Sequence, residues 1–299
     1  MKRFFVTLVS HCEKVWWDPG YRSLRMAADA MLTLQAWLEH RLGRVVTSTF
    51  CTFVDHLSSG EVVVDAAEVP DVVQRVLDGG GELGLHVHAP TASLASGAQD
   101  QFIAEDARRI AKLGFPSPTA YAAGDFVTSR GTISALEEAD IQVDCSVYAL
   151  EGPLERFGLH IDYRRPNLMP YRVSREDLCS EGSSRVIELP VSGWLPEFHS
   201  RAFAQMPLIQ QRILDRYAAL EDGVDVFQVF WHPFEIVTLD GKDNDALRDA
   251  GIRAGQGQGQ IGVNEAVMSA VRDFLGGFAE KPGVEIAHAG AAVTAWSQA

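Results

Sequence analysis

The sequence predicts an α/β barrel in a single domain, and three observations carry this prediction. Short apolar runs alternate with longer amphipathic runs along the chain, which is the pattern of βα units with a parallel sheet. No G-x-G-x-x-G segment follows the first apolar run, which argues against a Rossmann sheet. No linker divides the 299 residues, and α/β barrels of roughly 250 residues are common as one unit.

The predicted strands are short runs rich in Val, Phe and Thr, as half-buried and fully buried strands usually are. They span Phe4–Ser10, Val45–Val54, Glu82–His88, Thr119–Ala122, Ile141–Val147, Arg185–Val191, Val226–Trp231 and Val284–Ala287.

The predicted helices are the segments in which apolar residues recur every three or four positions. They span Tyr21–Leu42, Val69–Leu77, Asp100–Leu113, Thr128–Ala139, Ala204–Leu220 and Asn264–Phe278. Pro70 falls in the first turn of the second helix, and the glycines at 79–81 end it. Together these elements make about seven or eight βα units.

Two segments interrupt this alternation. Residues 148–184 contain Pro153, Pro166 and Pro170 among scattered charges, which indicates an irregular excursion. Residues 239–262 include the run Gly255–Gln260, in which Gly and Gln alternate. Such a loop is expected to be too flexible to pack a core, and because it follows the Val226–Trp231 strand we expect a lid on the active face.

Composition and charge exclude several classes of function. The formal net charge is −14 and the isoelectric point is about 5.0, so a nucleic-acid or anionic-membrane partner is not expected. The four cysteines form no C-x-x-C pair, which fits a reducing compartment. The first apolar run ends at Glu13, too early for a secretory signal, and no run reaches the ~20 apolar residues of a membrane span. We therefore expect a cytoplasmic protein.

Polar side chains collect at the carboxyl ends of the predicted strands, where α/β barrels carry their chemistry. These residues are His11, Glu13, Asp55, His56, His86, His88, Asp125, His232, Glu235 and His288. Imidazole and carboxylate groups that converge at one barrel mouth indicate a metal or acid–base site.

The pair His86 and His88 is the most specific feature of this set. Residues i and i+2 of a strand face the same side, so both imidazoles can reach one ion such as zinc. The structural alternative is a pair of half-buried histidines that are hydrogen-bonded to the backbone. His11 and Glu13 repeat the same spacing as candidate ligand or base groups, the alternative being a solvated strand end.

His232 and its neighbours form the second candidate group. A histidine held by the following Pro233 at the end of an apolar strand is placed to act as a general acid, the alternative being a packing histidine. The aromatic side chains Trp16, Trp17, Phe126 and Trp231 are candidates for an apolar wall that contacts a sugar ring, although aromatic residues are more often core.

These segments resemble the NodB-like polysaccharide deacetylases of carbohydrate esterase family 4. The stretch Gly81–Pro90 is similar to the family's metal motif, and Thr49–Val54 to the strand before it. The stretches Tyr121–Phe126 and Asp144–Val147 resemble a later motif pair, and Phe230–Glu235 resembles the motif of the catalytic histidine. The order of these stretches covers most of residues 1–299.

The resemblance implies a distorted (β/α)7 barrel and a metal-dependent hydrolase that removes an acetyl or related acyl group from a small sugar or polar metabolite. It implies a divalent ion, zinc, on Glu13, His86 and His88, with His11 nearby and His232 as the acid. Asp125 or Glu13 is then the base. Trp16, Phe126, Trp231 and Glu235 are the expected substrate contacts.

Three departures from the family pattern keep other functions open. The usual Asp-Asp after the first strand is replaced by His11 and Glu13, the usual H-x-x-x-H is H-x-H, and Ala122 stands where an arginine is expected. A sugar-binding relative without hydrolysis is one alternative. A different divalent-metal barrel enzyme, such as a lyase or isomerase, is another.

Overall fold

A computed structural model gives the structure of the chain. It describes residues 2–57, 59–89, 100–148, 154–156, 159–163, 168–195 and 200–299. Of the 148–184 excursion it describes the hairpin of β7 (Leu154–Arg156) and β8 (Leu159–Ile161), and β9 (Tyr171–Arg172). The remainder of that excursion lies partly outside the described residues.

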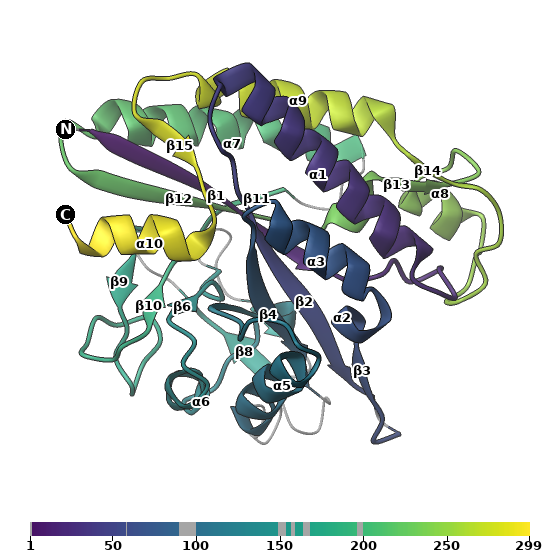
Figure 1. Cartoon of the computed structure of the whole chain (residues 1–299), viewed down its shortest axis with the longest axis horizontal. Coiled ribbons are helices and arrows are strands. Elements are labelled where there is room, and N and C mark those ends of the chain that lie inside the picture. Colours follow the sequence, from purple (N-terminus) through teal and green to yellow (C-terminus); the bar gives the residue numbers. More distant parts are fainter. Residues whose placement is uncertain are drawn as a thin grey trace.

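A curled sheet of parallel strands forms the centre of the molecule (Figure 1). In spatial order it contains β11, β12, β1, β2, β4, β5, β6 and β10, and neighbouring members are parallel. Their bounds are β1 (Arg3–Cys12), β2 (Thr49–His56), β4 (Glu82–His88), β5 (Ala120–Ala123), β6 (Val143–Asp144), β10 (Ile187–Glu188), β11 (Val191–Trp194) and β12 (Val224–Trp231).

One continuous segment, 187–195, joins the two ends of this sheet. Its first part pairs with β6, and the N–H of Leu189 donates to the carbonyl of Asp144 at 2.7 Å. Its second part pairs with β12, and the N–H of Leu195 donates to the carbonyl of Phe230 at 3.0 Å. Pro190, which has no N–H to donate, separates the two parts. Because β10 and β11 share one position around the ring, the predicted distorted (β/α)7 barrel is confirmed.

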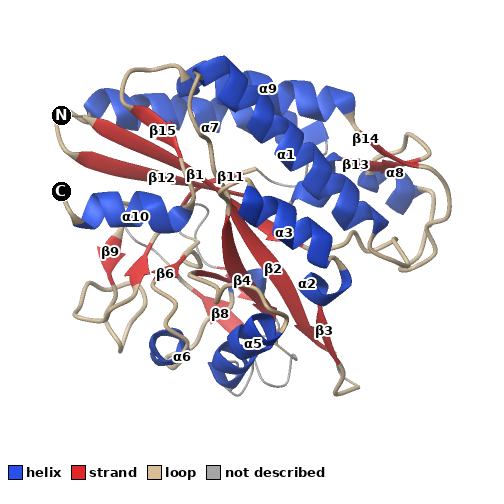
Figure 2. Ribbon diagram, in the orientation of Figure 1, coloured by secondary structure: helices blue, strands red, loops and turns tan. Residues whose placement is uncertain are grey.

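Helices cover the outside of the sheet, and one closes its base (Figure 2). Their bounds are α1 (Arg22–Leu42), α2 (Asp65–Glu68), α3 (Pro70–Asp78), α5 (Asp100–Lys112), α6 (Thr132–Glu138), α7 (Ser200–Ala219), α8 (Asn244–Asp249), α9 (Glu265–Ala279) and α10 (Ala289–Ser297). The main core packs between the sheet and the outer helices, and a second core lies inside the barrel. Helix α10 contributes Ala289, Ala292 and Val293 to the inner core, so it closes the amino-terminal end of the strands.

Several predicted elements differ from the structure at their ends. Strand β1 continues to Cys12, which places His11 inside the strand rather than after it. Strand β2 begins at Thr49, not Val45, and extends to His56. The short strand β3 (Val62–Val64), which pairs with β2, was not predicted. The predicted last strand is β15 (Val284–Ile286), which pairs with β1, and the helix α10 that follows it was not predicted.

The Gly/Gln segment is folded, which corrects the expected flexible loop. Within residues 239–262 the structure has α8, and β13 (Val237–Leu239) pairs with β14 (Ile261–Val263) across the segment. The N–H groups of Gly255 and Gly257 donate to the carbonyls of Trp16 and Trp17 at 3.0 and 2.7 Å. A Cβ at Gly257 would lie 2.5 Å from the ring of Trp17, so only glycine fits this approach.

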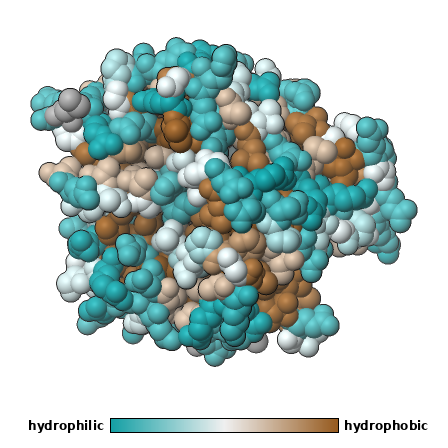
Figure 3. Space-filling model, in the orientation of Figure 1, coloured by the Kyte–Doolittle hydropathy of each residue, from teal (hydrophilic) through white to brown (hydrophobic). Residues whose placement is uncertain are grey.

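The face of the molecule seen in Figure 3 is mostly hydrophilic. Smaller apolar areas lie between the hydrophilic side chains. Within the described residues no helix has both the length and the apolar character needed to cross a membrane.

Two buried carboxyl groups lie side by side where β6 meets β10. Asp144 and Glu188 are register partners, and both are fully buried. Ser146 Oγ donates to Asp144, and the N–H of Val147 donates to Glu188 at 3.0 Å. Burial raises the pKa of Asp144 to about 6, although hydrogen bonds with Ser146 and Glu188 lower it in part. The folded chain therefore keeps a proton on this pair at pH values where an exposed aspartate has lost it.

The proton held by this pair predicts how the free energy of unfolding depends on pH. Because the pKa of Asp144 is about 6 in the folded state and about 3.9 in the unfolded state, the folded chain binds more protons between these values. The free energy of unfolding therefore falls as the pH rises through this window, by up to about 3 kcal/mol from this group. Asp144→Asn should remove that part of the slope in urea unfolding at pH 4.5 and 7. Asp249→Asn, at an exposed residue of α8, is the control, and equal slopes in the two variants would contradict the assignment.

Candidate active site

The carboxyl ends of neighbouring strands bring most of the predicted site residues to one mouth of the barrel. In register, His86 of β4 lies opposite Phe53 of β2 on one side and Ala122 of β5 on the other. His11 lies near the end of β1, and its ring centroid is 4.0 Å from that of His86 and 5.4 Å from that of His232. Alternation along each strand turns these side chains to the inside of the barrel.

His86 and His88 form the centre of the cluster. The Nδ1 atom of His86 donates to the carbonyl of Ala122 at 2.9 Å, so its Nε2 atom carries the lone pair. The Nε2 atom of His88 lies 3.1 Å from it. Two nitrogen ligands at about 2.0–2.1 Å from one tetrahedral ion lie about 3.3 Å apart, so the pair has the spacing of two zinc ligands. Without an ion, the same contact is a hydrogen bond from His88 to His86.

Two histidines of the cluster, His86 and His11, are held in their neutral form. Burial and, to a smaller extent, the field of His88 together lower the pKa of His86 to about 3. Burial likewise puts the pKa of His11 well below its ordinary value, with His86, His232 and His88 adding to the effect. The Nε2 atom of His11 is buried and has no hydrogen-bond partner among the described residues. Neutral imidazole is the form that binds metal ions.

Glu13 lies on the other side of the cluster, against His232. Its Oε1 atom is 3.2 Å from Nε2 of His232, and both side chains are about one-fifth exposed. Burial on its own would raise the pKa of Glu13, but the hydrogen bond with His232 and the fields of His232, His86 and His88 outweigh it and hold this pKa at about 2. Glu13 is therefore a carboxylate at neutral pH.

The predicted ligand set is only partly assembled. In the part of the chain that the structure describes, no three or more His, Cys, Asp or Glu side chains are arranged around one point as ligands of an ion. His86 and His88 converge, whereas Glu13 is paired with His232. Glu13 as the third ligand stays a prediction.

Asp125 and Phe126 lie in an unusual turn directly after β5. Both have positive φ, 50° and 57°, which is rare for residues other than glycine. The Oδ2 atom of Asp125 is 3.7 Å from Nδ1 of His88, and the ring of Phe126 stacks on Tyr148 with centroids 4.9 Å apart. Backbone strain of this kind is concentrated at functional sites, so the turn supports a role for both side chains.

Gly124, at the start of this turn, gives a further prediction. A Cβ at this position would lie 2.4 Å from Cδ2 of His88 and 2.6 Å from the carbonyl of Val87. Gly124→Ala should therefore displace His88 and lower the free energy of unfolding by about 1–3 kcal/mol, as overpacking does. Gly20→Ala is the control because a Cβ there has no neighbour within 4 Å. Equal urea midpoints for both variants would show that the turn accommodates the methyl group.

Two aromatic residues that the sequence did not single out line the cluster. The ring of Phe230 lies 4.2 Å from His11, 4.9 Å from His232 and 5.1 Å from Phe126. The ring of Phe53 lies 5.0 Å from His88. Strand alternation could have found Phe230, because it stands two residues before His232 and so faces the same side.

Three predicted substrate contacts lie elsewhere. Trp231 alternates with Phe230 and His232, so it faces outward into the main core, where its Nε1 donates to Ser10 Oγ at 2.6 Å. Glu235 is 4% exposed and accepts a hydrogen bond from Asn244 at 2.9 Å. Trp16 packs partly buried against the main core. The structure thus gives Trp231 and Glu235 packing and positioning partners instead of a place on the wall of the cluster. Within the described part of the chain, no ring contact joins Trp16 to the cluster.

Comparisons with known proteins show that the barrel has a known fold. No model of a protein family matches the chain, and the sequences of curated proteins give no match either. Solved structures do match. A protein assigned as a polysaccharide deacetylase from Mycobacterium smegmatis superposes with a TM-score of 0.57 and 14% identity, covering 99% of this chain and 91% of its own.

The chain has the polysaccharide deacetylase fold. A protein assigned as a glycoside hydrolase or deacetylase from Parabacteroides distasonis gives a TM-score of 0.59 at 13% identity, over 99% of this chain and 71% of its own. An allantoinase shares the same fold, with a TM-score of 0.58, 12% identity and coverage of 99% and 91%. The NodB-like barrel that the sequence motifs predicted is therefore confirmed as the fold.

Proposed function

We propose that the chain is a metal-dependent hydrolase that removes an acetyl or related acyl group from a small sugar or polar metabolite. The observation that carries the proposal is the His86–His88 pair, whose Nε2 atoms lie 3.1 Å apart while the carbonyl of Ala122 fixes the tautomer of His86. A hydrogen bond of this kind from the second ring nitrogen is typical of metal-binding histidines. The deacetylase fold supports the same reaction class.

The residues at the mouth suit a zinc ion held by His86, His88 and Glu13. Neutral imidazoles and a carboxylate are the donor set of hydrolytic zinc sites, and the shifted pKa values of His86 and Glu13 favour these forms at neutral pH. Bound zinc would supply polarisation of the acyl carbonyl and a water that ionises near neutral pH.

His232 is the proposed general acid. Its Nε2 atom faces the Glu13 carboxylate at 3.2 Å, so Glu13 can accept a hydrogen bond from the ring and orient it. Its Nδ1 atom is buried and has no hydrogen-bond partner among the described residues. A protonated His232 can thus donate to a leaving amine or alcohol at the mouth. Asp125, or Glu13 itself, is the proposed base, and His11 completes the polar cluster between the two sides.

The aromatic side chains beside the cluster suggest where an acyl methyl group would lie. Phe126 and Phe230 meet edge to face at 5.1 Å and adjoin His11 and His232. An apolar wall next to a polar centre excludes water from all but the reacting groups. We therefore place the acyl group near Phe230 and the polar body of the substrate toward the open mouth.

The likeness to an allantoinase favours a second candidate, hydrolysis of an amide bond in a small nitrogen-rich metabolite. The same His232 acid would serve that reaction, because an amide nitrogen also needs a proton as it leaves. A sugar-binding protein without hydrolysis remains the non-enzymatic alternative.

Metal analysis together with substrate assays tests the proposal. The chain is purified without chelator, its zinc content is measured, and acetate release from N-acetylated monosaccharides is followed beside ammonia release from small amides. Bound zinc with acetate release supports deacetylation, and bound zinc with amide turnover supports the second candidate. Bound metal with neither activity would point to a different metal enzyme. Absence of metal, with no effect of His86→Ala on any activity, would contradict both hydrolase proposals.

A further inference from the structure

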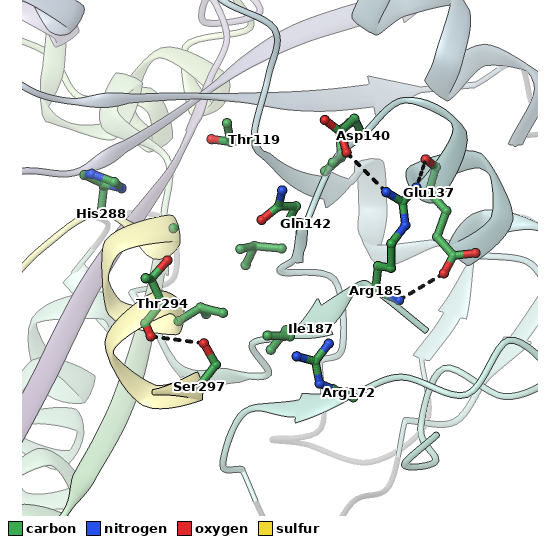
Figure 4. A pocket seen from close by; sticks show the side chains of 14 residues that line it. Thr119, Glu137, Asp140, Gln142, Arg172, Arg185, Ile187, His288, Thr294 and Ser297 are labelled. Carbon is green, nitrogen blue, oxygen red and sulfur yellow. Dashed lines mark hydrogen bonds and ion pairs between the residues drawn. The ribbon is translucent and has the colours of Figure 1, made fainter. Parts of the chain in front are cut away.

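A cavity of about 470 Å³ lies at the end of the barrel opposite the His86–His88 mouth. Its walls come from the amino-terminal ends of β5, β6 and β10, from the end of α6 and from α10. Figure 4 shows Arg172, Arg185 and Glu137 on one side of this space, and Thr294 and Ser297 of α10 on the other. His288, which the sequence placed with the strand-end residues of the mouth, lies here instead, beside Glu82 at the start of β4. No residue of the His86–His88 cluster lines the cavity, so it is separate from the proposed chemistry.

Two arginines and two carboxylates line this cavity, and three of these four groups are paired. The guanidinium of Arg185 already has partners: it pairs with the carboxylate of Asp140 at 3.5 Å and donates to the carbonyl of Glu137 at 2.8 Å. The carboxylate of Glu137 is held by Arg175 through two hydrogen bonds of 2.8 and 2.9 Å. Arg172, in contrast, has no ion-pair or side-chain hydrogen-bond partner among the described residues. Arg172 is an exposed residue, so its guanidinium is a solvated cation in the wall of the cavity.

The floor of the cavity is apolar. It contains Val143, Ile187 and Val293, which are at most 6% exposed. The hydroxyl groups of Thr294 and Ser297 and the amide of Gln142 stand around this floor. A second hollow of about 400 Å³ adjoins the first through Arg172 and Ser297, and Trp296 and the carboxylate of Glu181 line it. A free cation beside apolar walls suits an anion with an apolar body.

Backbone groups nearby favour a carboxylate over a phosphate. The first N–H groups of α10 are already used: Ala289 donates to Thr49, Gly290 to Glu82, and Ala291 to His288. A dianionic phosphate would find one guanidinium and no free helix amides here. A single carboxylate can take two parallel hydrogen bonds from the one guanidinium and leave its charge balanced.

We propose that this cavity is a binding site for a small organic monocarboxylate. Its carboxylate would pair with Arg172, and its apolar body would lie on Val143, Ile187 and Val293. The site is independent of the acyl-hydrolase chemistry at the other end of the strands.

Calorimetric titration with sodium benzoate tests this site. The titration uses the His86→Ala chain as background, so that a carboxylate cannot be held by a metal at the mouth. Benzoate should bind saturably to one site, and Arg172→Gln should weaken it about 10–100-fold, because a charge-assisted hydrogen-bond pair is lost. Arg212→Gln, an exposed arginine of α7, is the matched control and should change nothing. Thr294→Trp, which fills the cavity from α10, should abolish binding.

Other outcomes would overturn the proposal. Benzyl alcohol binding as tightly as benzoate, without any effect of Arg172→Gln, would show a purely apolar cavity. Inorganic phosphate binding as tightly as benzoate with the same loss in Arg172→Gln would show a general anion site. If benzoate did not bind the folded His86→Ala chain, the proposed binding site would be contradicted.

Discussion

His86→Gln should abolish zinc binding and lower acyl hydrolysis by about 10³-fold or more. Polarisation by a metal contributes several kcal/mol to the transition state, and each 1.36 kcal/mol is a factor of ten in rate. In the structure both ring nitrogens of His86 are placed: Nδ1 donates to the carbonyl of Ala122, and Nε2 faces Nε2 of His88. Glutamine fills similar space and cannot present a ring nitrogen. The measurement is zinc content per chain together with the rate of acetate release.

His56→Gln is the matched control for this variant. His56 is also a buried histidine near a strand end, and it pairs with Asp106 at 2.8 Å, away from the cluster. It should cost stability but leave zinc content unchanged. If both variants keep their zinc, or if both lose it in equal measure, His86 is not a ligand.

His232→Asn should leave zinc in place and lower kcat by about 10²–10⁴-fold, which is the usual range for loss of a general acid. KM should change much less, because His232 acts on the leaving group as the bond breaks. The substrate dependence is the sharpest readout. An N-acetyl sugar has a leaving amine that needs a proton, whereas a phenyl acetate has a leaving group that departs without one. The loss should therefore be large for the amide and small for the ester.

The exposed His40→Asn on α1 serves as the control for His232. An equal loss on both substrates would indicate that His232 supports the structure of the site and does not donate the proton. Glu13→Gln extends the test, because it removes the negative charge that faces His232 at 3.2 Å. Like His232→Asn, the Glu13→Gln variant should hydrolyse the N-acetyl sugar more slowly than the parent protein does.

The sequence predicted the barrel and the location of its mouth because both depend on strong local patterns. The strand Glu82–His88 has the same bounds in the structure, since three glycines precede it and its apolar run is unbroken. The convergence of His11, His86 and His232 followed from their positions at strand ends.

Other features depend on contacts that no local pattern contains. Helix α6 begins at Thr132 and not at Thr128, because Asp100 of the preceding helix holds Ser129 and Thr132 in a turn. Helix α10 was missed because it is rich in alanine and covers the barrel base without a strongly amphipathic pattern. The positive φ angles of Asp125 and Phe126 are likewise set by packing against His88 and Tyr148.

Two residues were wrongly predicted as substrate contacts because their side chains do not face the same side as His232. Trp231 lies next to His232 in sequence but on the opposite face, and Glu235 turns inward to Asn244 after the strand has ended. Proximity in sequence to a reactive residue was a weaker guide than the two-residue period that identified the His86–His88 pair.

The pairing of β1 with β12 has a consequence for the order in which the chain folds. The other neighbouring strands of the ring, including the segment 187–195 between β6 and β12, pair with partners that are closer in sequence and can associate while the sheet is still an open arc. Strand β1 pairs Arg3 with Val224 of β12, so it cannot complete this pairing until the last strand of the ring has formed. Pairings of high sequence separation are slow to form, so closure of the ring between β1 and β12 is expected to be a late step. The circumference of the mouth, and with it the distance between the His232 side and the Asp125 side, is then fixed only when folding is nearly complete.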